Sequence, residues 1–281
     1  MADFAGEEER SPQARARAEL ALCTLAAHIA DGTAPLIVLG GLMPEILTEG
    51  TGPQHLGTSD VDMLLVVHLE QTAGLARIET ALLTAGFEAE THQNGWRWRG
   101  RIDGYPVKLE FLCDLDTEPE GIIAIPGCQT LRANNLRGTG YVAHDFTTRE
   151  LTADIPGRGP TTVTIRFAGL GGYLLTKCVA VRYRGKDKDF YDLTFVLLHN
   201  RAGGPTDAAQ WLLNGSLADR LPGLKSIFLE VRERFYSVTS PGPKGFAAES
   251  ERADPSASDE QNRALAAAAV NEFIDAMLAG S

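Results

Sequence analysis

Two acidic residues at the start of an apolar segment are the first candidates for chemistry in this sequence of 281 residues. Asp60 and Asp62 lie two positions apart in GTSDVDMLLVV, so on a strand both side chains share one face. Two like charges on one face of a buried strand are costly unless a cation neutralises them. Because Mg²⁺ prefers such oxygen ligands, the pair predicts a divalent-cation site. The alternative is a loop or N-cap aspartate with a second one by chance.

A third acidic residue lies in a later apolar segment, VKLEFLCD. Glu110 stands in the middle of this predicted strand, although glutamate is uncommon in strands and is rarely buried alone. Beside Asp60 and Asp62 it would complete a three-carboxylate site for two metal ions. The alternative is an exposed acid at the edge of a sheet, with Asp114, on the same face, as the fallback third ligand.

Small and hydroxylated residues flank the acidic pair. Gly40 and Gly41 directly follow the apolar run PLIVL and precede a short helical stretch. Glycines there let backbone N–H groups approach a phosphate at a helix N-terminus, and the alternative is a simple tight turn. Thr58 and Ser59 add hydroxyl groups next to the acids, where they could contact a phosphate or a metal-bound water.

The elements that must position these residues are predicted by hydrophobic periodicity. The pattern indicates helices over 13–30, 44–47 and 72–85, and buried strands over 35–39 and 61–68. Three further strands over 88–93, 96–102 and 105–113 are joined by Asn94-Gly95 and Asp103-Gly104, which are strong hairpin signals. This order predicts an α/β fold with a mixed sheet and helices packed on it.

The second half of the chain is predicted to be mostly helical. Periodic segments cover 168–184, 187–199, 206–213, 224–236 and 260–278. We therefore expect an α/β domain over 12–160 and a helical domain over 161–281. The segment 237–259 is rich in Pro, Ser and Glu, which predicts a mobile linker.

Composition limits the classes of function. The formal net charge of −11 argues against a protein that coats nucleic acid or membranes by bulk charge, although it leaves room for a local basic groove. Four cysteines and the histidines, His55 among them, show no metal-ligand spacing. The apolar runs are too short to span a bilayer, and the acidic N-terminus is unlike a signal peptide. We expect a cytoplasmic protein with no membrane partner.

The motifs together resemble a known superfamily. A strand ending in GG, then TSDVD entering a second strand, then a later strand carboxylate, resembles the DNA-polymerase-β-type nucleotidyltransferases, whose pattern is G-G/S…D-x-D…D/E. The segment LLTKCVAVRYRGKDKDFYDLTFVL (174–197) resembles the lysine, arginine and K/R-D-x₂-D-L signature of AbiEii-type nucleotidyltransferases. These include MenT toxins and other toxins of bacterial toxin–antitoxin pairs. The resemblance covers about residues 35–200 and implies an enzyme with a polymerase-β-type core.

The resemblance also implies roles for the matching positions. It implies that Asp60 and Asp62 are the metal-binding pair and that Glu110 is a third carboxylate, which ligates metal and accepts a proton. Gly40 and Gly41 match a turn that faces the phosphates, and Ser59 matches the neighbouring hydroxyl. Lys177 matches a lysine that faces the triphosphate, and Asp192, with Lys188 beside it, matches the acid of the last motif.

Local charge fits this interpretation. Five cations, Lys177, Arg182, Arg184, Lys186 and Lys188, fall within twelve positions of an otherwise acidic chain. A triphosphate beside three carboxylates needs such cations as well as Mg²⁺. The alternatives are an exposed helix face with i,i+4 pairs, and a structural Asp192 that holds Lys177 or Arg182 by a salt bridge.

The predicted reaction is Mg²⁺-dependent transfer of NMP from an NTP to an acceptor hydroxyl at a two-metal site, with release of pyrophosphate. By resemblance the acceptor is a tRNA 3′ end, and the protein is a toxin with a cognate antitoxin. The alternatives are a small hydroxylated acceptor such as an antibiotic, and a catalytically silent binding module.

A strand face with Arg97, Arg99 and Arg101 could lie along RNA, or simply face solvent opposite buried tryptophans.

Overall fold

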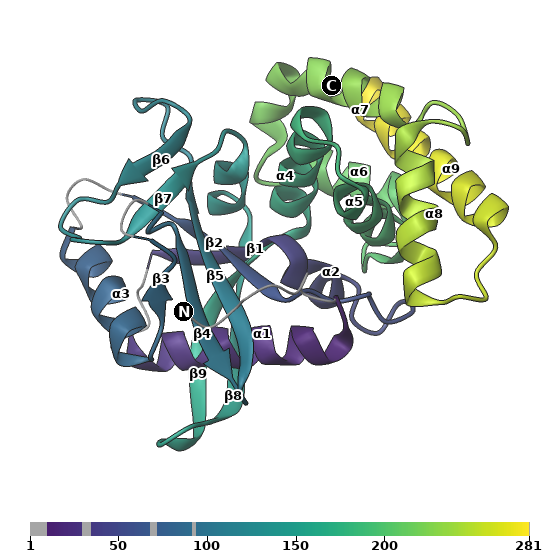
Figure 1. The fold of residues 1–281 in the computed structure, drawn as a ribbon. Helices are drawn as coiled ribbons and strands as arrows, with labels where there is room; N and C mark the ends of the chain where they lie inside the picture. The colour runs from purple at the N-terminus through teal and green to yellow at the C-terminus, as the bar shows by residue number, and fades with distance from the viewer. Residues whose placement is uncertain (1–9, 30–34, 68–71, 92–93, 281) are drawn as a thin grey trace.

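The computed structural model describes residues 10–29, 35–67, 72–91 and 94–280. A mixed sheet with helices on it forms one part of the molecule, and a group of helices forms the other (Figure 1). The mixed α/β fold and the helical second half are therefore confirmed. The strands are β1 (Leu36–Leu39), β2 (Asp60–Leu65), β3 (Glu88–Ala89), β4 (Arg97–Ile102), β5 (Tyr105–Cys113), β6 (Gly121–Ala124), β7 (Arg132–Asn135), β8 (Phe146–Ile155) and β9 (Gly159–Ala168).

The sheet places β2 and β5 at its centre. The strand order is β3-β4-β5-β2-β1-β9-β8, and β7 pairs with the end of β5 and with β6. Strand β2 is antiparallel to β1 and parallel to β5. In this register Asp62 lies opposite Glu110 on one side and opposite Leu39 on the other. The sheet topology thus brings the predicted acidic residues of two separate segments together.

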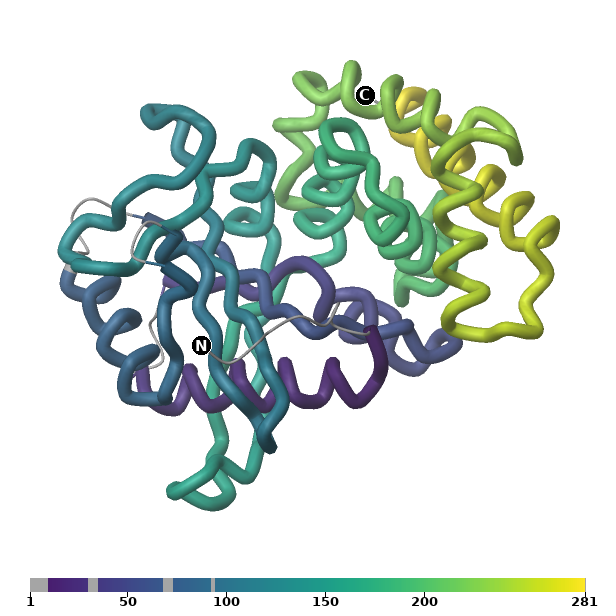
Figure 2. The backbone as a smooth tube through the Cα atoms, viewed as in Figure 1, coloured from purple at the N-terminus to yellow at the C-terminus, as the bar shows by residue number. Residues whose placement is uncertain are grey.

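The helices divide between the two parts of the molecule. Helix α1 runs beside the sheet, and α4 to α9 pack together at the other end, with α8 and α9 outermost (Figures 1 and 2). The helices are α1 (Pro12–His28), α2 (Met43–Leu47), α3 (Thr72–Thr84), α4 (Leu170–Tyr183), α5 (Asp187–His199), α6 (Pro205–Leu213), α7 (Lys225–Phe235), α8 (Pro241–Ala253) and α9 (Asp259–Gly280), with 3₁₀ turns η1 (Gly40–Leu42), η2 (Thr139–Ala143) and η3 (Ala218–Leu224).

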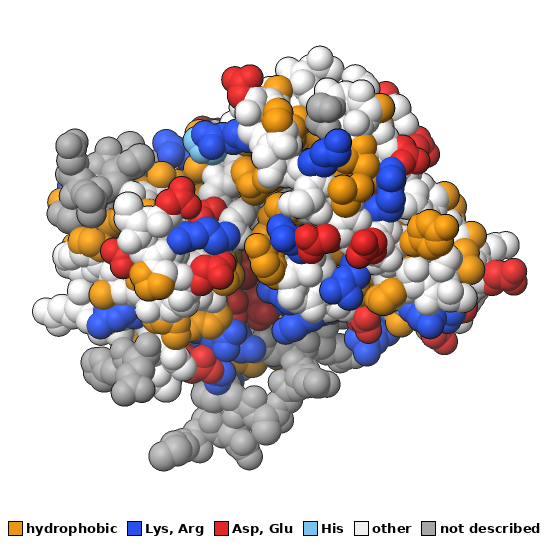
Figure 3. All heavy atoms as spheres, turned by 90° about the horizontal axis from the view of Figure 1, so that it is seen from above, with side chains coloured by type: hydrophobic (Ala, Val, Ile, Leu, Met, Phe, Trp, Pro, Cys, Tyr) orange, Lys and Arg blue, Asp and Glu red, His pale blue; other side chains and the backbone are white. Residues whose placement is uncertain are grey.

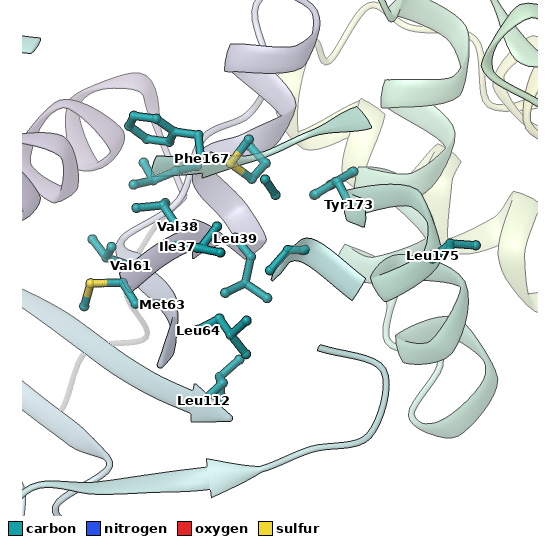
Figure 4. Packing of buried hydrophobic residues seen from close by; sticks show 14 of the residues in the cluster. Ile37, Val38, Leu39, Val61, Met63, Leu64, Leu112, Phe167, Tyr173 and Leu175 are labelled. Atoms are coloured by element: carbon teal, nitrogen blue, oxygen red, sulfur yellow. The ribbon is translucent and has the colours of Figure 1, made fainter. Parts of the chain in front are cut away.

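The hydrophobic core holds β2 in a fixed orientation. Val61 and Met63 are fully buried, whereas Asp60 and Asp62, which alternate with them, are only partly buried. Figure 4 shows these two apolar side chains packed with those of β1 and β9, among them Phe167. Because strand side chains alternate between faces, burial of the apolar residues turns both aspartates to the opposite face.

The hairpin predicted at Asp103-Gly104 is confirmed. Both residues have positive φ angles, 52° and 82°, as a type I′ turn requires, and Ile102 pairs with Tyr105 directly across it. The other predicted strands agree with β1, β2 and β4 within a few residues at their ends. Strand β3, however, ends at Ala89 and pairs there with Trp98, so Asn94-Gly95 does not form the predicted two-residue turn between β3 and β4. Residues 68, 92 and 93, at the ends of two predicted strands, lie outside the described residues.

The predicted mobile linker over 237–259 is wrong. Residues Pro241–Ala253 form α8, with Pro at the first helical turn. Phe246 lies on a buried face of this helix and stacks on Tyr191 of α5 at 5.6 Å between ring centroids. The Pro/Ser/Glu composition concealed an amphipathic face that packs on a neighbouring helix.

The sheet also extends past the domain boundary expected at residue 160. Strand β9 continues to Ala168 and pairs with β1 through Val38 and Phe167, so this segment belongs with the sheet. Its partner β8 was not predicted as a strand, because most of its residues are polar and half-exposed on the edge of the sheet. Among the described residues, no helix is both long and apolar enough to cross a membrane.

Candidate active site

Gly40 and Asp62 are in close contact at the centre of the candidate site. Gly40 follows β1 with a φ of +72°, and a Cβ atom there would lie 1.9 Å from Asp62 Oδ2. A Cβ on Gly41 would lie 2.5 Å from Thr58 Oγ1. Any other residue would clash, so the glycine pair lets the backbone turn directly over the acidic strand. The predicted GG turn and acidic pair are thus neighbours in space.

Burial and a neighbouring carboxylate disfavour the negative charge of Asp62. Burial raises its pKa, the charge of Asp60 raises it further, and Lys188, Arg184 and Lys177 act in the opposite direction. The Ser59 hydroxyl donates to Asp60 Oδ1 at 3.4 Å, but a hydroxyl brings no charge. Two carboxylates on one strand face therefore retain a need for a cation.

Glu110 completes the acidic group but already has a cationic partner. Arg97 on β4 donates from Nε to Glu110 Oε1 at 2.7 Å. Burial first and the charge of Asp62 second raise the pKa of Glu110 to about 7, although Arg97 opposes this shift. A carboxyl group with this pKa can accept a proton near neutral pH and release it again.

These carboxylates fit a magnesium ion by donor type but do not form a ready cluster. In the part of the chain that the structure describes, no three His, Cys, Asp or Glu groups converge closely enough to hold a metal ion. Asp60 and Asp62 supply two oxygen ligands on one face, whereas Glu110 is turned to Arg97. The fallback ligand Asp114 instead accepts hydrogen bonds from Gly138 N and Gly140 N at 2.8 and 2.9 Å. Asp114 therefore holds the start of η2.

Lys177 lies at the centre of a buried ionic network. Its Nζ lies 2.7 Å from Asp192 Oδ2 and 3.4 Å from Asp189 Oδ1, and all three side chains are at most 7% exposed. Arg184 also binds Asp189, at 2.7 Å. Burial acts to raise the pKa of Asp192, but the positive charges of Lys177 and Arg10 outweigh it and hold this pKa well below its usual value. This geometry matches the structural alternative considered for Asp192.

His55 is part of this network, although from the sequence we expect only an ordinary histidine that makes a loop contact. Its Nδ1 accepts from Gly57 N at 3.1 Å, so Nε2 carries the proton and donates to Asp192 Oδ1 at 3.1 Å. The ring lies against Tyr191 and Phe195. Burial lowers the pKa of His55, so the imidazole stays neutral and adds no charge.

Arg10 connects the start of the described chain to this network. Its guanidinium lies 2.7 Å from Asp192 Oδ1 and 2.9 Å from Glu249 Oε2, and it donates to Gly57 O at 3.0 Å. Glu249 comes from α8, the helix that was expected to be a linker. The network therefore ties the loop before β2 to α5 and α8.

The remaining predicted cations and arginines occupy distinct positions. Lys186 and Lys188 are exposed, and Lys188 is the cation whose charge acts most strongly on Asp62. On β4, Arg97 and Arg99 both contact Glu90, while Trp98 is buried and donates to Gly95 O at 2.8 Å. The tryptophan packs in the core and these arginines meet acids, so the strand face carries less net positive charge than its sequence suggested.

The surface above the sheet is hollowed between the two parts of the molecule. Figure 3 shows acidic side chains on the floor of this hollow and Lys and Arg side chains along its walls. This arrangement suits a ligand that carries both phosphate groups and a divalent cation.

The raised pKa of Glu110 predicts a pH dependence of stability. The ordinary pKa is 4.5 and the folded-state pKa is about 7, so between these values the folded chain keeps a proton that the unfolded chain has lost. Stability present below pH 4.5 is therefore lost as the pH rises toward 7. We expect Glu110→Gln to show a smaller decline than the wild type in metal-free urea unfolding at about pH 5 and about pH 7.5. An equal decline in both proteins would contradict the burial assigned to Glu110.

No known family model matches the chain, and no curated protein matches it significantly.

Proposed function

We propose that the chain is a metal-dependent nucleotidyltransferase that moves NMP from an NTP to an acceptor hydroxyl and releases pyrophosphate. The observation that carries this proposal is the register of β2 and β5, which sets Asp62 beside Glu110 with Gly40 turning over the acidic strand. The motif order of the superfamily requires this combination of an acidic pair, a carboxylate on a neighbouring strand and a glycine turn. A bound Mg²⁺ held by Asp60, Asp62 and Glu110 would supply Lewis-acid stabilisation of the reacting oxygens.

The side chains take the following roles in this proposal. Glu110 accepts the proton of the acceptor hydroxyl, because the β2–β5 register places its carboxylate beside the acidic pair. Lys188 and Arg184 neutralise the triphosphate, because both already act on the charge of Asp62 from the helical part. Lys177, with its ammonium held by Asp189 and Asp192, positions the start of α5 that carries Lys188.

The acceptor we propose is the 3′ end of a tRNA, with the protein acting as a toxin that a cognate antitoxin restrains. Support comes from the segment 174–197, whose lysine, arginine and K-D-x₂-D-L pattern resembles the AbiEii-type toxins. Its KDFYDL part folds as the first turns of α5, with Asp189 and Asp192 buried. The chain's net charge of −11 is compatible with this acceptor only if the cations gather at the hollow.

The test is label transfer with a panel of acceptors. Wild-type protein is incubated with Mg²⁺, each α-labelled NTP, and either total tRNA or a mixture of aminoglycosides and lincosamides. We expect label in tRNA and at least about a hundredfold less with Glu110→Gln, because general-base catalysis contributes about that much. Label only in the small molecules would replace the tRNA acceptor. No transfer to either would favour a silent binding module.

Expression of the wild type should arrest growth, and Asp60→Ala should relieve the arrest.

A further inference from the structure

Arg97 and Glu110 face each other across two paired strands. The antiparallel register of β4 and β5 sets Arg97 directly opposite Glu110, with Nε 2.7 Å from Oε1. Their side chains are 33% and 15% exposed, so water weakens the ion pair without removing it. The guanidinium is thus hydrogen-bonded to the carboxylate that the proposed metal site needs as its third ligand.

A second carboxylate lies within reach of the same guanidinium. Arg97 Nη1 lies 3.5 Å from Glu90 Oε2, and the guanidinium stands over the Trp96 ring at 4.3 Å. Glu90 lies just beyond β3, on the side of β4 away from β5. Arg97 therefore stands between one carboxylate that belongs to the site and one that does not.

Charge decides which carboxylate Arg97 prefers. Without a metal ion, Glu110 lies beside the negative charge of Asp62, and Arg97 is its direct hydrogen-bonded cation. A divalent cation on the acidic pair would repel Arg97 and attract Glu110. Because strand register holds the backbone, a rotation of the Arg97 side chain is enough to strengthen its contact with Glu90.

We propose that Arg97 is a positioning residue that holds Glu110 as an internal counter-charge and transfers to Glu90 when a divalent cation binds Asp60 and Asp62. This inference rests on the proposed function. It implies that the cation competes with Arg97, so that Glu110 enters the metal site only after cation binding begins. The free protein then keeps the acidic group partly neutralised.

Direct Mn²⁺ binding by the full-length chain, without nucleotide, tests this competition by electron paramagnetic resonance or calorimetry. We expect Arg97→Gln to bind Mn²⁺ about five- to tenfold more tightly than wild type, because a competing charged hydrogen bond is gone. Arg97→Lys keeps the charge but loses the planar guanidinium that contacts both carboxylates, so it should tighten Mn²⁺ binding less than Arg97→Gln does. Glu90→Gln removes the second acceptor and should weaken Mn²⁺ binding about two- to threefold.

Two controls separate this mechanism from bulk charge and from misfolding. Arg101→Gln removes the same charge four residues along β4, where the exposed guanidinium donates to Gly104 O. Similar tightening by Arg101→Gln and Arg97→Gln would overturn the proposal. In a Glu110→Gln background, Arg97→Gln should no longer change Mn²⁺ affinity. Melting curves by circular dichroism verify that each variant is folded.

The failure of this inference is distinguishable from failure of the proposed function. If Asp62→Asn abolishes Mn²⁺ binding but Arg97→Gln leaves the affinity unchanged, the metal site stands and the role of Arg97 is wrong. If neither wild type nor Arg97→Gln binds Mn²⁺, both proposals are wrong. Binding by Arg97→Gln alone would support the competition in its strongest form.

Discussion

Replacement of Asp62 by Asn is expected to reduce nucleotidyl transfer about a thousandfold or more, because loss of a metal-binding charge removes several kcal/mol of transition-state stabilisation. The same change should not lower the thermal midpoint. Burial and the charge of Asp60 raise the pKa of Asp62, so its ionised form costs stability in the folded state. The measurement is the initial rate of label transfer at saturating Mg²⁺, together with a melting curve.

A matched control for this variant is Asp154→Asn. Asp154 is an exposed aspartate on β8, at the far edge of the same sheet. It should transfer label at the wild-type rate. A wild-type rate in Asp62→Asn would show that the acidic pair is not catalytic, and an equal loss in both variants would point to a general effect of charge.

Replacement of Asp192 by Ala is expected to cost about 3–5 kcal/mol of unfolding free energy, because it leaves buried cations without their partner. Asp192 forms ion pairs with Lys177 and Arg10 and accepts a hydrogen bond from His55. Its side chain is only 3% exposed. Urea unfolding at neutral pH measures the loss. The contribution is present above the ordinary pKa of 3.8 and is lost as the pH falls through the depressed folded-state pKa, so the variant should also lose part of the wild type's sensitivity to acid.

The matched control is the surface ion pair of Arg182 and Glu230. The Glu230 side chain is 44% exposed, so Glu230→Ala should cost less than about 1 kcal/mol. A small effect of Asp192→Ala with a large loss of activity would contradict the structural role and return Asp192 to the nucleotide site.

Local signals account for what the sequence predicted well. Alternating apolar residues fixed the face of β2, and the Asp103-Gly104 turn fixed the hairpin of β4 and β5. That two-residue turn also sets the register that pairs Arg97 with Glu110. The sequence therefore contains the information for this contact, although we did not predict the contact from it. The pairing of β2 with β5 brings together distant segments, and it was anticipated only indirectly, from a glutamate in an apolar strand that needed partners and from the motif order of the resemblance.

The ionic network depends on long-range packing that no local pattern encodes. His55 and Asp192 are 137 positions apart, and Arg10 and Glu249 are 239 positions apart. Helix α8 escaped prediction because its Pro, Ser and Glu content resembles a linker, and its apolar face has meaning only against α5. Lys177 stands at a position that matches the motif's triphosphate-facing lysine. In the fold, however, it is buried between two carboxylates, and these determine its contacts.

The central claim is that the acidic site transfers a nucleotidyl group. Parallel reactions with α-labelled and γ-labelled NTP, Mg²⁺ and total tRNA test it most directly. The proposed function predicts α-label in the acceptor, γ-label in pyrophosphate, and neither with Asp62→Asn. Transfer of the γ-label to the acceptor, or α-label transfer that persists in Asp62→Asn, would contradict it.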